Sequence, residues 1–148
     1  MYTILIHKLH SYLIHHNPEL ILNLEESFSL RSYLEEKVAS IADYQLQLVA
    51  DGKPAYIIEE LCMNAMTKEL RPSKFLYLRN ILEEEFPEHY LLLKENGTLT
   101  YEVVNLITAS NEVFDSIGFT EETEGNRILR YATIGVMKEY MTAKQLGK

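Results

Sequence analysis

The sequence predicts an all-α protein, a single multi-helical domain of about six to seven helices that covers residues 1–148. Three observations support this prediction. Apolar residues recur at intervals near 3.6 along almost the whole chain, and no alternation of apolar and polar residues extends over the length of a strand. No Gly/Ser-rich linker and no internal repeat divides the chain. The length of 148 residues fits one domain of ordinary size.

The first half of the chain predicts three helices. The first ends at Asn17, because a residue that precedes proline avoids the α conformation and Pro18 follows. The second covers about residues 28–50 and stops at Asp51-Gly52, since glycine accepts the left-handed position after a helix. The third has Pro54 in its first turn and ends before Pro72. The expected apolar faces are Leu5, Leu9, Tyr12 and Leu13; Leu30, Leu34, Val38, Ile41 and Leu48, with Gln45 as a polar intruder; and Ile57, Ile58, Leu61, Ala65 and Met66.

The second half predicts four more helical segments. Ser73 is expected to cap a helix that ends near Phe86. A short helical piece around residues 90–94 stops at Asn96-Gly97, and the helix after it ends at Gly118. Residues 119–125 (FTEETEG) form the clearest loop, and Asn126 caps the last helix. The expected inward residues are Phe75, Leu78, Leu82 and Phe86; Val103, Leu106, Ile107, Val113, Phe114 and Ile117; and Leu129, Ala132, Val136 and Tyr140.

Charge is unevenly distributed over the chain. The 14 basic and 22 acidic side chains give a formal net charge of −8. Residues 80–126 carry eleven acidic side chains and one lysine, whereas five of the six charged residues from 127 onward are basic. The acidic middle segment suits a basic partner or the protein's own basic C-terminal helix. The overall charge argues against general nucleic-acid binding, whose affinity comes from neutralised phosphates.

Cysteine usage and hydropathy indicate the compartment. The single cysteine, Cys62, excludes an internal disulfide, which fits a reducing cytosol and a cytoplasmic protein. No apolar run approaches the roughly 18 residues that a membrane span needs, so no membrane partner is expected. The N-terminal segment carries His7, Lys8 and His10 where a signal peptide needs uninterrupted apolar residues, and it is interpreted as the first helix of the fold.

The sequence predicts no catalytic, cofactor or metal site. His7 and His10 have a spacing that brings two imidazoles together, but a zinc site needs three or four ligands and no supporting set follows. Adjacent carboxylates such as Glu83 to Glu85 point in different directions on a helix, mostly into water. Cys62 lies among apolar residues and is expected to be an inert core thiol. The chain contains no GxGxxG, P-loop, HExxH or GxSxG motif.

Lys68, Arg71, Lys74 and Arg79 form a basic patch in the sequence, opposed only by Glu69. They lie on both sides of Pro72-Ser73, loosely in the layout of a helix-turn-helix. The second helix of such a motif needs polar side chains for the major groove, but residues 74–82 (KFLYLRNIL) are largely apolar and three glutamates follow. The patch is therefore a candidate partner-binding surface, with local salt bridging favoured over DNA contact.

The ten tyrosines suggest an interface. Tyrosine is enriched at protein interfaces because its ring is apolar and its hydroxyl is polar. Five of them lie near the edges of the apolar faces of their predicted helices: Tyr33, Tyr44, Tyr56, Tyr77 and Tyr101. There they would contact either a second subunit of a homodimer or water, and the sequence favours neither alternative.

A series of short motifs resembles a known family. The motifs are Ser11-Tyr12-Leu13, Pro18-Glu19-Leu20, Ala39 and Tyr44 leading to Gly52, Glu60-Leu61, Leu70, Ser73-Lys74-Phe75 and Glu85-Phe86. Their order resembles a small all-helical domain-of-unknown-function family of Bacteroidetes, whose members often lie near mobile-element genes. The sequence departs from the family at Arg71-Pro72. The resemblance implies a multi-helical fold and no catalytic residues.

These observations favour a non-catalytic protein-interaction module with an unidentified protein partner or a second copy of itself. The alternative is an accessory or regulatory protein in nucleic-acid or mobile-element transactions. That role would use the basic patch, or the acidic segment facing a basic partner. An enzyme without a recognisable motif is the third and least favoured interpretation.

Overall fold

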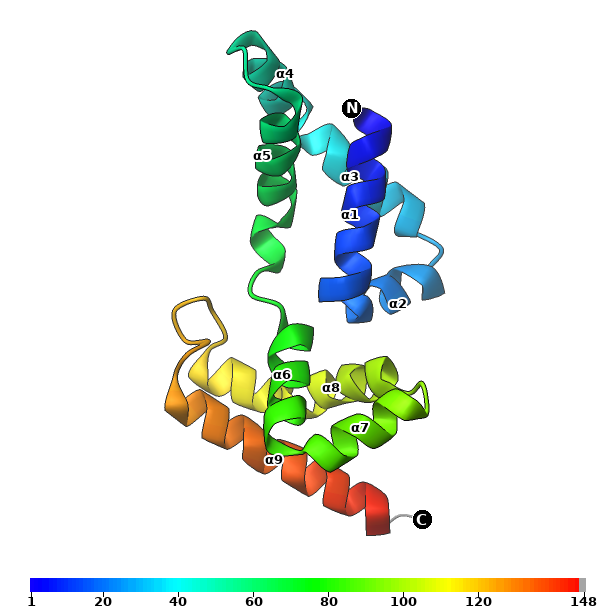
Figure 1. Ribbon diagram of the computed structural model, residues 1–148, viewed down its shortest axis with the longest axis vertical. Coiled ribbons are helices and arrows are strands. Elements are labelled where there is room, and N and C mark those ends of the chain that lie inside the picture. Colours follow the sequence, from blue (N-terminus) through cyan, green and yellow to red (C-terminus); the bar gives the residue numbers. More distant parts are fainter. Residues whose placement is uncertain (147–148) are drawn as a thin grey trace. The chain divides into compact units, whose positions relative to one another are not determined.

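The computed structural model describes the backbone of residues 1–146 and the side chains of residues 1–144 (Figure 1). This part of the chain is helical and contains no β-strand, which confirms the all-α fold class. None of its helices is long and apolar enough to cross a lipid bilayer. The contacts within the chain group into two compact units, residues 1–71 and residues 72–148. That the whole chain forms a single domain stays a prediction.

Unit 1 is built around the first helix. Its elements are α1 (Tyr2–His16), α2 (Pro18–Glu26), α3 (Leu30–Ser40), α4 (Ala42–Ala50), α5 (Ala55–Thr67) and the short 3₁₀ helix η1 (Lys68–Leu70). Helix α1 packs against α2, α3 and α5, and α4 packs against α5 (Figure 1). Leu5, Leu9 and Leu13 recur every four residues on α1, so they share one face, and all three are fully buried. They join Leu34, Val38, Ile58 and Cys62 in one core.

Unit 2 has its own core. Its elements are α6 (Lys74–Glu85), α7 (Pro87–Glu95), α8 (Leu99–Ile117) and α9 (Arg127–Leu146). The two longest helices, α8 and α9, pack along each other, and α6 and α7 pack against α8 (Figure 1). The four helices share one core. It contains the fully buried side chains of Leu78, Val103, Leu129 and Met137, and α7 contributes Tyr90.

The predicted helix ends are confirmed where they depend on local chemistry. The hydroxyl of Ser73 accepts a hydrogen bond from the Leu76 amide at 3.0 Å, so it caps α6. The Oδ1 atom of Asn126 accepts from the amides of Ile128 and Leu129, at 2.8 and 3.2 Å. Such bonds satisfy amides that the first helical turn leaves without partners. Gly52, Gly97 and Gly118 follow α4, α7 and α8 with positive φ angles.

The predicted number of six to seven helices is too low, for two reasons. Pro18 ends α1 but also begins α2, because proline suits the first helical position, and this second helix was not expected. The helix predicted for residues 28–50 is interrupted at Ile41, which separates α3 from α4. There the Ser40 hydroxyl donates to the Lys37 carbonyl at 2.6 Å, and the Ile41 amide bonds three residues back, to Val38. A serine that bonds to the backbone in this way competes with the helical ladder.

Candidate protein-interaction site

The four residues of the predicted basic patch are divided between the two units. Lys68 lies in η1 and Arg71 just after it, both exposed and both in unit 1. The Arg71 guanidinium donates to the carbonyl of Asn64 at 3.2 Å. Lys74 and Arg79 lie on α6 of unit 2. The role of these four residues in partner binding stays a prediction.

Both basic residues of α6 contact aromatic rings of their own unit. The Lys74 ammonium lies 5.4 Å from the centre of the Phe114 ring. The Arg79 guanidinium lies 5.7 Å from the centre of the Tyr90 ring and donates to its hydroxyl at 3.1 Å. A cation over an aromatic face is attracted by the negative charge of that face. These two side chains therefore contribute to packing within unit 2.

The acidic middle segment meets the basic C-terminal helix, as one of the two sequence alternatives predicts. Arg130 of α9 donates to Glu84 at 2.8 Å and to Glu85 at 3.1 Å, at the end of α6. Partial burial lowers the pKa of the Arg130 guanidinium, but its hydrogen bonds to both carboxylates outweigh this effect and the pKa is raised. Lys144 of α9 similarly pairs with Glu102 of α8. Three of the eleven acidic side chains of residues 80–126 thus pair with α9 inside unit 2.

The side chains of His16 and Cys62, two residue types that could carry chemistry, have structural surroundings. No group of three or more His, Cys, Asp or Glu side chains suitable for a metal lies within the described residues. The His16 ring stacks on Tyr12, with 4.0 Å between ring centres, and so belongs to the packing of α1. Cys62 is fully buried, and burial raises the pKa of its thiol. A protonated, inaccessible thiol is a poor nucleophile.

The five tyrosines at stripe edges have different environments. Tyr77 is buried and packs edge-on against Phe114 and Phe119. Burial raises the pKa of its hydroxyl. Tyr33 is half-buried, and the remaining three are exposed: Tyr44, Tyr56 and Tyr101. Tyr77 is therefore core, and the other four stay compatible with both interpretations.

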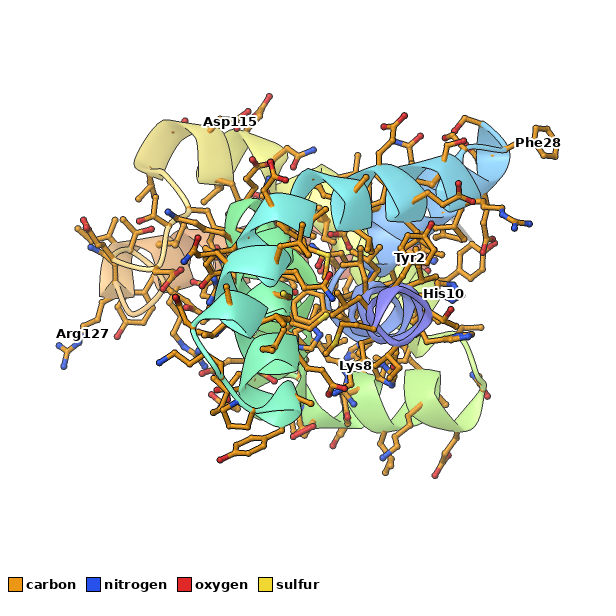
Figure 2. The ribbon with its side chains drawn as sticks, turned by 90° about the horizontal axis from the view of Figure 1, so that it is seen from above. Tyr2, Lys8, His10, Phe28, Asp115 and Arg127 are labelled. Atoms are coloured by element: carbon orange, nitrogen blue, oxygen red, sulfur yellow. The ribbon has the colours of Figure 1, made fainter. Side chains whose placement is uncertain are left out.

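The most exposed large apolar side chain is Phe28, in the turn between α2 and α3. Its side chain is 96 % exposed, and Figure 2 shows the ring projecting away from the end of α2. Phe28 is also the one non-glycine residue with a positive φ angle, 54°, in the part of the chain that the structure describes. A bulky residue with this backbone conformation is a genuine outlier. Two unusual properties thus coincide at one residue.

The turn at Phe28 has a regular hydrogen-bonding pattern. The Phe28 amide donates to the Glu25 carbonyl at 3.2 Å, and the Ser29 amide donates to the Leu24 carbonyl at 2.9 Å. This pair of bonds defines the Schellman motif, in which the left-handed residue after the helix is usually glycine. The hydroxyls of Ser27 and Ser29 lie 2.5 Å apart, and Ser27 also bonds back to the carbonyl of Asn23. The left-handed residue is therefore held in a well-ordered turn.

Phenylalanine at this position lowers the stability of the isolated chain. The left-handed conformation costs an L-residue about 1–2 kcal/mol, because Cβ approaches the following carbonyl oxygen. The exposed ring contributes no compensating burial. Glycine would satisfy the same hydrogen bonds without this cost. Phe28 therefore strains the turn and adds little apolar burial to unit 1.

Acidic side chains precede the exposed ring. Glu25 and Glu26 are both exposed, and neither forms an ion pair with any residue whose side chain is described. Arg31, the first basic residue after the turn in the sequence, pairs with Glu35 at 2.9 Å. The turn thus presents an apolar ring beside two uncompensated negative charges.

Sequence reasoning did not single out Phe28 as a candidate site residue. It placed this residue at the start of a helix, and no glycine marked the turn. The sequence does contain one indication of a helix end, Ser27-Phe28-Ser29 after a pair of glutamates. Serine hydroxyls often form hydrogen bonds with backbone groups at helix ends. Nothing in that signal specified the positive φ angle.

Comparison with known proteins gives no relative. Neither family models, nor curated proteins, nor solved structures match the chain. The resemblance to the helical Bacteroidetes family therefore stays a prediction. The function has to be inferred from the geometry of the chain.

Proposed function

We propose that the protein is a non-catalytic protein-interaction module in which Phe28 anchors the partner. The observation that supports this proposal is the coincidence of 96 % exposure with a positive φ angle at Phe28. Aromatic side chains that fill a pocket on the partner dominate the energetics of many interfaces. An exposed ring that costs the free protein stability has the properties expected of such an anchor.

The turn prepares the ring for binding. Burial of a phenylalanine side chain contributes about 1.5–3 kcal/mol. The strain at Phe28 is already present in the free protein, and the backbone bonds of Ser29 and the hydroxyl of Ser27 hold the turn. A partner therefore gains the burial without ordering the loop, and such preorganisation increases affinity.

The chemistry around the ring suggests the kind of partner. Glu25 and Glu26 lie just before Phe28 and are exposed. An apolar pocket bordered by lysine or arginine would complement both the ring and the two carboxylates. Opposite charges on the two surfaces mainly increase the association rate and weaken in salt.

Photo-crosslinking tests the proposal. The photoreactive residue p-benzoylphenylalanine replaces Phe28, and in a matched control it replaces Tyr56, an exposed aromatic residue on α5 of the same unit. We expect a discrete adduct from position 28, competed by the unlabelled wild-type protein but not by Phe28→Ala. Only diffuse labelling, or equal adducts from both positions, would contradict the proposal. An adduct of twice the chain's mass identifies a second copy as the partner.

The same experiment addresses the alternative function in nucleic-acid or mobile-element transactions. Nuclease treatment before irradiation removes any adduct that depends on nucleic acid. If the adduct at position 28 disappears, the alternative is favoured, and Lys68 and Arg71 become the first residues to substitute. A nuclease-resistant adduct favours the interaction module.

A further inference from the structure

Unit 2 contains a groove between α7, α8 and α9 that the proposed interaction through Phe28 does not use. Its volume is about 330 Å³, within the range of small-ligand sites. The apolar side chains along it are Leu92 and Leu93 of α7 and Met141 of α9, and Leu92 is exposed. Figure 1 shows the three helices that border it.

A shielded carboxylate lies in this groove. The Glu102 side chain on α8 is 14 % exposed. One of its oxygens accepts a hydrogen bond from the hydroxyl of Tyr140 at 3.3 Å, and the other accepts from the ammonium of Lys144. Because a shielded carboxylate has lost most of its hydration, it requires a cation or several donors.

Lys144 is a replaceable partner for this carboxylate. Its side chain is 54 % exposed, so it lies mostly in water while its ammonium contacts Glu102. Its ammonium lies 5.9 Å from the centre of the Tyr140 ring. The hydrogen bond with Glu102 is the main reason that the pKa of Lys144 is raised. A long side chain held in one geometry loses rotamer entropy, which weakens such pairs.

Two further acceptors line the same groove. Asn96 and Thr98, in the turn between α7 and α8, are exposed and line the groove. Thr98 precedes α8 but makes no side-chain capping bond. The amide oxygen of Asn96 and the hydroxyl of Thr98 are suitable acceptors for the remaining protons of an ammonium group.

We infer that this groove binds an organic cation with a primary ammonium group on an apolar stem. The ammonium replaces that of Lys144 at Glu102, and the stem lies along Leu92, Leu93 and Met141. Lys144 is then an intramolecular competitor that occupies the cation position in the free protein. This site is independent of Phe28, which belongs to the other compact unit.

A series of alkylammonium ions tests the inference on the whole 148-residue chain. Ethyl-, butyl- and hexylammonium chloride are titrated while the methyl signal of Met141 is followed by NMR. The affinity should rise by up to about fourfold for each added methylene, because each buried methylene adds apolar contact. Hexanol and hexanoate, which lack the cation, should bind at least tenfold more weakly than hexylammonium. Equal binding of the three, or no shift of the Met141 signal, would overturn the inference.

Two variants test the role of the ion pair. Glu102→Gln keeps the size of the side chain and an acceptor for Tyr140, and it should weaken hexylammonium binding at least tenfold. Glu112→Gln removes the same charge from an exposed position on the same helix and should leave binding unchanged. Lys144→Met keeps the apolar stem and removes the competing ammonium, so it should tighten binding severalfold. Unchanged affinity in Glu102→Gln, or weaker binding in Lys144→Met, would contradict the proposed site.

A final comparison distinguishes a free amine from a lysine side chain of another protein. A blocked Gly-Lys-Gly peptide presents the same ammonium and stem with a flanking backbone. Tighter binding of the peptide than of hexylammonium assigns the site to a protein lysine. Tighter binding of hexylammonium assigns it to a small amine.

Discussion

Three helix ends in this protein share one hydrogen-bonding pattern but differ in one residue. After α4 the left-handed residue is Gly52, after α7 it is Gly97, and after α2 it is Phe28. In each case two backbone amides donate to the last turn, which closes a Schellman motif. The difference shows that the backbone geometry does not require the phenylalanine. Two of these ends, those at Gly52 and Phe28, belong to the same unit and can be compared in one unfolding reaction.

The largest effect on stability is expected when phenylalanine replaces the glycine that follows α4. Gly52→Phe should lower the free energy of unfolding of unit 1 by roughly 1–3 kcal/mol, because φ is +76° there. A Cβ atom at Gly52 would meet nothing within 4 Å, so no steric clash of Cβ adds to the loss. The loss reports backbone strain, offset in part by the smaller freedom of phenylalanine in the unfolded chain. Urea unfolding followed by circular dichroism measures it. An unchanged midpoint would show that the left-handed position tolerates phenylalanine.

The N-terminus of α9 shows how much a favourable residue at a helix end contributes to the free energy of unfolding. Asn126→Ala removes the side chain that accepts from Ile128 and Leu129. The free energy of unfolding of unit 2 should fall by about 1 kcal/mol, the usual contribution of a capping side chain. Asn126→Asp, which keeps the acceptor, should retain most of the stability. Equal losses in both variants would contradict the capping role.

A smaller effect is expected when Phe28 is replaced by a residue that tolerates the left-handed region. Asparagine does so better than any other non-glycine residue, because its short polar side chain bonds locally. Phe28→Asn should raise the free energy of unfolding by about 0.5 kcal/mol. As an unlabelled competitor it should fail, like Phe28→Ala, to reduce the adduct that forms from position 28. A stable variant that retains partner binding would separate the strained backbone from the proposed anchor.

The smallest effect concerns the ion pair near the turn. Arg31 is exposed and pairs with Glu35 one helical turn later. Arg31→Ala should change the free energy of unfolding by less than about 0.5 kcal/mol, and raised salt should reduce the difference. A larger loss, measured by the same urea titration, would mean that the α2–α3 turn depends on this pair rather than on its backbone bonds.

Local chemistry explains how much of the fold the sequence could predict. Ser73, Asn126 and the glycines at helix ends act within a few residues of their position, so their roles are readable from the chain. The break near Ser40 depends on the bond from its hydroxyl to the Lys37 carbonyl, and the sequence does not specify which carbonyl a serine hydroxyl selects. The division at residue 72 lacks a Gly/Ser-rich linker, so composition gave no sign of two compact units.

The candidate sites were less predictable because they depend on contacts between distant residues. Tyr77 is buried through rings at positions 114 and 119, which its own helical stripe does not reveal. The groove near Glu102 requires α9 to bring Lys144 back to α8. Phe28 is unusual through its φ angle and its exposure, and neither property follows from the identity of its neighbours. The contact of the acidic segment was more predictable than these sites. Its charge alone indicated either a basic partner or the protein's own basic C-terminal helix.

The stability of Phe28→Gly tests most directly the claim that this residue serves binding rather than folding. Glycine removes the left-handed strain, and its greater freedom in the unfolded chain opposes part of that gain. We predict that the free energy of unfolding of unit 1, measured by urea titration, rises by roughly 0.5–1 kcal/mol. A fall in that free energy would show that the Phe28 side chain stabilises the isolated chain and would contradict its assignment as an anchor for a partner.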